Sequence, residues 1–66
     1  MNNTIRVQRA IKNITQEELA QALKMSRQTV NSIETKKTIP STVTTLKMAK
    51  YFGVKAEEIF SLEEGE

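Results

Sequence analysis

Apolar residues recur at helical spacing along most of the chain, in groups separated by short polar stretches. Two of these groups stand close together between residues 15 and 34. Residues three or four apart share one face of a helix, so this segment predicts two short helices joined by a turn of about three residues. We expect the apolar faces of the two helices to pack on each other. The apolar positions are Leu19, Ala20 and Leu23 in the first helix and Val30 and Ile33 in the second.

Capping residues mark the start of both helices. Thr15 followed by Glu18 is a capping box, in which the hydroxyl accepts from the N–H of Glu18 and the carboxylate accepts from the N–H of Thr15. Ser26 is an N-cap residue for the second helix. Ala20 stands where the two helices cross, and its small side chain allows their axes to come close. The segment therefore predicts a helix-turn-helix.

The sequence TQEELAQALKMSRQTVNSIE resembles the helix-turn-helix of the Cro and repressor family of DNA-binding proteins (the XRE family). The family pattern is Thr-Gln-Glu-x-Leu-Ala, a small residue, a turn, then Ser-x-x-x-Val-x-x-Ile-Glu. The resemblance covers almost the whole chain, through Arg9, Ile39-Pro40-Ser41, Phe52-Gly53-Val54 and the 57–60 segment. It implies one all-α, five-helix, lambda-repressor-like DNA-binding domain over residues 1–66. The helix-turn-helix would span about 16–34 and a dimerisation segment about 55–66.

Two lysines depart from the family pattern. Lys24 stands in the turn where the family usually has glycine and the backbone takes a positive φ, and Lys36 replaces a glycine in the following loop. A lysine adopts the left-handed conformation at a cost of about 1 kcal/mol. We therefore expect the turn to form at Lys24 with tolerated strain.

A first helix is predicted from Thr4 to Asn13. Its core-facing residues are expected to be Ile5 and Arg9, with either Val7 or Ala10 beside them.

A fourth helix follows from the N-cap Ser41 to about Phe52. We expect Leu46, Ala49 and Phe52 to lie in the core and Met48 to be partly buried.

The second helix of the motif carries hydrogen-bonding side chains of the kinds that read bases. Arginine can grip guanine O6 and N7, glutamine and asparagine can pair with adenine N6 and N7, and serine can serve either. Docking of this motif presents the N-terminal residues of its second helix to base edges. We expect Arg27, Gln28 and Ser32 to read bases directly, and Asn31 to read a flanking base or contact a phosphate. The expected phosphate-binding residues are Gln16, Ser26, Thr29, Lys36, Lys37 and Thr38.

The resemblance also implies an ion pair between Arg9 and Glu34, which would fix the first helix against the recognition helix. If the pair is partly out of water, truncating one partner costs about 3–5 kcal/mol. The alternative is two unrelated surface charges.

Charge is distributed unevenly, although the net charge is only +2. Residues 1–50 hold nine Lys or Arg against three Glu, whereas residues 51–66 hold one Lys against five Glu. A basic body with an acidic tail suits DNA binding, and an ordinary solvated surface is the alternative interpretation.

Composition excludes several classes of function. The chain has no Cys and no His, which removes disulfides, the commonest zinc ligands and every Cys or His nucleophile. It also has no Asp, and its scattered glutamates offer no paired acid and base, so we expect neither an enzyme nor a metal or cofactor. No apolar run approaches the roughly 20 residues of a membrane span, and the first residues lack the order of a signal peptide. These features favour a cytoplasmic protein.

The C-terminal segment carries three apolar residues, Ile59, Phe60 and Leu62. A chain this small is expected to bury one of Ile59 and Phe60 but not all three, which predicts a shared surface between two copies. Residues 61–66 are either an added strand or a frayed acidic tail.

The leading hypothesis is a small transcriptional regulator, expected to be a repressor, that binds palindromic double-stranded DNA as a homodimer. We expect no small-molecule ligand, because the DNA-binding fold leaves no room for a pocket of about 300 Å³. The alternative is a protein-interaction module on the same fold, such as an antitoxin.

Overall fold

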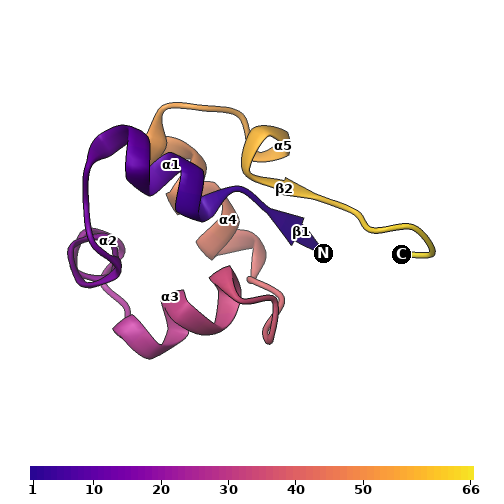
Figure 1. The fold of residues 1–66 in the computed structure, drawn as a ribbon, viewed down its shortest axis with the longest axis horizontal. Helices are drawn as coiled ribbons and strands as arrows, with labels where there is room; N and C mark the ends of the chain where they lie inside the picture. The colour runs from indigo at the N-terminus through magenta and orange to yellow at the C-terminus, as the bar shows by residue number, and fades with distance from the viewer.

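The computed structural model describes residues 1–66 as five helices and a two-stranded ribbon (Figure 1). The helix-turn-helix lies at one side of the molecule, and the ribbon joins the two ends of the chain. The elements are β1 (Asn2–Asn3), α1 (Ile5–Lys12), α2 (Gln16–Leu23), α3 (Arg27–Glu34), α4 (Thr42–Phe52), α5 (Ala56–Ile59) and β2 (Phe60–Ser61). The predicted all-α domain with a short C-terminal strand is confirmed.

Local signals place the helix ends where the sequence predicts them. Thr15 Oγ1 accepts from the N–H of Glu18 at 3.1 Å, and Glu18 Oε1 accepts from the N–H of Thr15 at 3.0 Å. Ser26 and Ser41 cap α3 and α4 through their hydroxyl groups. The backbone is left-handed at Lys24, with φ of 57°, as the turn requires. The starts of α2, α3 and α4 are thus each fixed by a side chain close to them in sequence.

The core lies between α2, α3 and α4, and α5 closes one end of it. Ala20 is buried in α2, which packs on α3, and its small side chain suits a close approach of the two helices. The ten buried residues are Ile5, Leu19, Ala20, Leu23, Val30, Ile33, Met48, Phe52, Ile59 and Phe60.

The predicted core face of α4 is wrong in two places. Leu46 is 60% exposed, whereas Met48 is fully buried with 0% exposure. At about 100° per residue, Thr45, Met48 and Phe52 share one helix face, and Leu46 lies well away from it. The threonine on the core face hides this register from a search for apolar periodicity.

The first helix buries less apolar surface than predicted. Ile5 is the only fully buried residue of α1, and both Val7 and Ala10 are exposed. The half-buried residues of α1 are the polar Gln8 and Arg9, so polar contacts occupy the inner face where a second apolar residue was expected.

Of residues 61–66, only Ser61 lies in a strand, β2, and the residues after it end in a turn. Asn2 pairs with Ser61 and Asn3 with Phe60 in an antiparallel ribbon. This ribbon covers Phe60, which is 9% exposed, and Ile59 is buried as well, so the expectation that only one of them is core is wrong. None of the helices is long and apolar enough to pass through a lipid bilayer.

The register of α4 gives a stability prediction. Met48→Ala should lower the free energy of unfolding by about 2–4 kcal/mol, because it opens a cavity in the core. Leu46→Ala should lower it by less than about 1 kcal/mol, because that side chain is already in water. Urea unfolding followed by circular dichroism measures both. Equal losses from the two substitutions would contradict the register.

Candidate nucleic-acid interface

The recognition helix α3 turns its apolar side inward and its hydrogen-bonding side outward. Val30 and Ile33 are buried against α2, while Arg27 and Gln28 are exposed at the N-terminal end. Further along the helix, Asn31 and Ser32 are half-buried. The residues predicted to read bases are therefore accessible from outside, most fully in the first turn.

The C-terminal end of α3 is held by an ion pair to α1. Arg9 donates through Nε to Glu34 Oε1 at 2.9 Å and through Nη2 to Glu34 Oε2 at 3.1 Å. Its remaining nitrogen, Nη1, donates to the carbonyl of Ile14 at 3.1 Å. The two charged side chains are only 15% and 10% exposed. The forked geometry fixes the orientation of both side chains.

Gln16 joins the same carboxylate from α2. Its amide nitrogen donates to Glu34 Oε2 and to Asn31 Oδ1, the latter at 3.2 Å. The amide has two hydrogens, and these two bonds use both of them. The side chain predicted to donate to a phosphate is therefore engaged within the chain. The backbone N–H of Gln16, by contrast, has no acceptor within the chain and lies at a helix N-terminus that favours anions.

Opposing effects act on the pKa of Glu34. Burial raises this pKa, but hydrogen bonds from Arg9 and Gln16 and the positive charges of Arg9 and Arg6 lower it by more. The net effect holds the pKa of Glu34 below its ordinary value, so its carboxylate is ionised at neutral pH.

A side chain of β1 also contacts the end of α3. Asn3 Nδ2 donates to the carbonyls of Ile33 at 3.0 Å and Glu34 at 3.3 Å. Carbonyls in the last turn of a helix lack intrahelical partners, so Asn3 satisfies two of them. Sequence analysis missed this contact, because 30 residues separate Asn3 from Ile33.

The hydroxyls of Ser26 and Thr29 form a pair at the start of α3, with their oxygens 2.8 Å apart. Ser26 Oγ also accepts from the N–H of Thr29 at 3.1 Å. One hydroxyl hydrogen is used between the two residues, so the other remains available to an outside acceptor.

The loop after α3 carries the other residues predicted to contact phosphates. Lys36 has a positive φ of 68°, and its ammonium contacts Glu63 Oε1 at 2.6 Å and Asn2 Oδ1 at 3.1 Å. The hydrogen bond from Lys36, with a second from the N-terminal amine, lowers the pKa of Glu63. Lys37 and Thr38 are exposed, and their side chains make no hydrogen bond or ion pair. Two of the three residues are thus free to contact DNA.

A polar cleft of about 550 Å³ opens beside this network, between α1, α2 and α3. Arg6 lines it together with Gln16 and Asn31, and it is exposed without an ion pair. Arg6 precedes Arg9 by three residues, which places both on one face of α1. That spacing is the sequence signal by which Arg6 could have been found.

Of the three residues predicted at a dimer interface, Leu62 alone is open to solvent, at 69% exposure. Glu63 beside it contacts Lys36, so Leu62 lies at the same end of the molecule as the loop after α3. The segment that follows this loop adds three further exposed apolar side chains, Ile39, Val43 and Leu46.

Comparison with known proteins identifies the family. A family profile described as Helix-turn-helix matches residues 5–59. The chain belongs to the helix-turn-helix family of the Cro and repressor type. Members of this family are DNA-binding regulators rather than enzymes.

Relatives that match over nearly the full length agree with this assignment. An uncharacterized HTH-type transcriptional regulator of Methanocaldococcus jannaschii, MJ0272, is 48% identical over 66 residues and covers 100% of both chains. The uncharacterized HTH-type transcriptional regulator YgzD of Bacillus subtilis is 39% identical over 64 residues, 97% of each chain. An uncharacterized HTH-type transcriptional regulator of Archaeoglobus fulgidus is 39% identical over 66 residues, 100% of this chain and 93% of the relative.

The ion pair at the end of α3 gives a prediction within this helix-turn-helix protein. Arg9→Ala should lower the free energy of unfolding by about 2–3 kcal/mol, slightly less than for a fully buried pair, because Gln16 still donates to Glu34. Arg6→Ala removes an equal charge from the same helix and should change it by less than about 0.5 kcal/mol. Chemical denaturation measures both. Similar values for the two variants would mean that the ion pair does not stabilise the fold.

Proposed function

We propose that this regulator is a sequence-specific repressor that binds a palindromic operator as a homodimer through the major groove. The observation that supports this most is the division of α3. Its C-terminal half is fixed by Arg9, Gln16 and Asn3, while Arg27 and Gln28 are left without partners on the outward surface. A rigid helix with free hydrogen-bonding groups at its N-terminal end fits the docking geometry of this motif.

The outward side chains suit direct reading of bases. Arg27 carries a guanidinium that can donate twice to one guanine, and Gln28 can both donate to and accept from one adenine. Asn31 and Ser32 follow at the next turn of α3, where Asn31 is already oriented by the amide of Gln16. We assign base reading to Arg27 and Gln28 first, with Ser32 and Asn31 on neighbouring bases or phosphates.

Phosphate binding is assigned to groups on both sides of α3. On one side, Lys37 and Thr38 are exposed and have no side-chain partner, and Lys36 can join them by exchanging Glu63 for a phosphate. On the other side, the backbone N–H of Gln16 has no acceptor within the chain, and Arg6 is exposed without an ion pair. These contacts carry no sequence information but set the register of the protein on the duplex.

We propose that the homodimer forms through four exposed apolar side chains, Ile39, Val43, Leu46 and Leu62, which are named the dimer face. This face lies next to the phosphate-binding loop. A twofold contact there places two copies of α3 side by side on one face of a duplex, with half-sites about one helical turn apart. Ile59 and Phe60 support the face from inside rather than forming it.

We propose repression as the outcome of DNA binding. The family profile covers residues 5–59, and we propose that this domain regulates by occupying its site, in the cytoplasm where its DNA lies. The antitoxin-like alternative assumes an acidic tail free to bind a partner. In this structure two of the tail glutamates, Glu63 and Glu66, are paired with the N-terminal amine of Met1.

Base reading is tested by selecting bound sequences from a random duplex pool and then measuring variants on the selected site. Arg27→Ala and Gln28→Ala should each lose about 1–3 kcal/mol of binding free energy on that site and far less on random duplex. Lys37→Ala should weaken binding to both duplexes equally, because it contacts phosphate only. Equal losses on both duplexes for Arg27→Ala and Gln28→Ala would mean that these residues do not read bases.

The dimer face gives a separate prediction. Leu46→Glu and Leu62→Glu should each weaken self-association by at least about tenfold, because a carboxylate would have to be desolvated at the interface. Ile11→Glu is the matched control, since Ile11 is equally exposed but lies on α1 outside this face. Sedimentation equilibrium measures the dissociation constant. A monomeric wild type, or equal weakening by Ile11→Glu, would overturn the assignment.

A further inference from the structure

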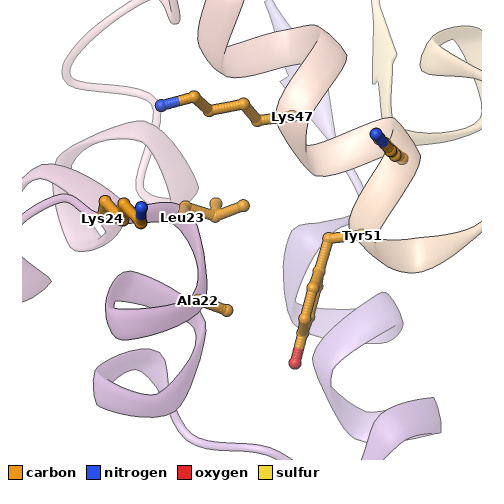
Figure 2. Close-up of a pocket in the computed structure, with 6 residues that line it drawn as sticks. Ala22, Leu23, Lys24, Lys47 and Tyr51 are labelled. Atoms are coloured by element: carbon orange, nitrogen blue, oxygen red, sulfur yellow. The ribbon is translucent and has the colours of Figure 1, made fainter.

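A second cleft, of about 600 Å³, lies between the C-terminal end of α2 and the second half of α4. Figure 2 shows Ala22 and Leu23 on one side of it and Tyr51 on the other. Three lysines complete its lining: Lys24, Lys47 and Lys50. The expectation that the fold has no room for a pocket of about 300 Å³ is therefore wrong.

The charges around this cleft are all of one sign. No acidic residue lines it, and none of its three lysines forms an ion pair within the chain. A fourth lysine, Lys12, places its ammonium 5.3 Å from the centre of the Tyr51 ring, at the edge of the same region. Converging cations without counter-ions produce a positive potential that attracts an anionic partner.

The chemistry of the lining specifies what kind of anion fits. Ala22, Leu23 and Tyr51 form an apolar floor, which suits an apolar side chain. The three ammonium groups belong to exposed, flexible side chains, and no buried polar side-chain atom lacks a hydrogen-bond partner. Apart from the Tyr51 hydroxyl, the polar groups of the lining are ammonium groups on long stems, which can each meet a separate carboxylate.

We infer that this cleft binds an acidic peptide segment of a partner protein, with one apolar side chain on the floor and flanking carboxylates at the lysines. The cleft adjoins the proposed DNA contacts only at Lys24, which precedes the α3 cap Ser26 by two residues. Gln16 lies at the opposite end of α2, an eight-residue helix of about 12 Å. Tyr51 and Lys50 likewise lie in the last turns of α4, away from the end that follows the phosphate-binding loop. The α4 side of the cleft, with Lys47, Lys50 and Tyr51, thus lies away from these contacts.

The test uses the whole protein and the peptide EEFEE, with backbone amide shifts followed by NMR. The amides of residues 22–24 and 47–51 should shift saturably. Lys47→Gln and Lys50→Gln should each weaken binding by about two- to fivefold, the range expected for one exposed ion pair. Lys55→Gln is the matched control, because Lys55 is an exposed lysine outside the cleft, and it should leave the affinity unchanged.

Three comparisons can overturn the inference. If QQFQQ bound as tightly as EEFEE, the lysines would not contribute to binding. If EEAEE bound as tightly as EEFEE, the apolar floor would not contribute. A random duplex of about 20 base pairs is the third probe. If it shifts the amides of residues 47–51, which lie away from α3, the cleft is a DNA surface rather than a peptide site. Failure of sequence-specific DNA binding would not affect any of these outcomes.

Discussion

The Glu34 carboxylate is the point at which three helices of this regulator are tied together. It ends α3, and it accepts two hydrogen bonds from Arg9 of α1 and one from Gln16 of α2. Apolar packing on Ala20 is non-directional and allows α2 and α3 to rotate slightly against each other. A forked ion pair has a defined plane and does not allow such a rotation. The carboxylate therefore sets the angle at which the recognition helix leaves the body of the protein.

This arrangement divides eight residues of helix between two tasks. The last turn of α3 supplies carbonyls to Asn3 and a carboxylate to the ion pair, so its polar groups are satisfied within the chain. The first turn supplies only the Ser26 cap, and Arg27 and Gln28 keep their side chains free. Rigid positioning of free hydrogen-bonding groups reduces the ordering cost of binding. In so short a helix, stability and recognition are compatible because they use opposite ends.

Sequence predicted the features whose causes are local. The cap at Ser26 and the left-handed turn at Lys24 each depend on residues a few positions away, and both are present. The register of α4 was missed because a threonine stands on the core face and Leu46 stands off it, so the strongest apolar period pointed the wrong way. The burial of both Ile59 and Phe60 depends on pairing with the other end of the chain, which no local pattern records.

The charge distribution has a different meaning in the fold than along the chain. Along the sequence, a basic body and an acidic tail suggest one surface for DNA and another for a protein partner. In the fold, however, Glu63 of the tail lies against the ammonium of Lys36. When a phosphate takes the place of this carboxylate, Lys36 exchanges one anion for another, so its net gain is smaller than that of an unpaired lysine. Such an exchange also releases fewer counterions per contact. On the proposed interface, Lys37 and Arg6 therefore contribute most of the salt-dependent affinity, and Glu63 reduces the contribution of Lys36.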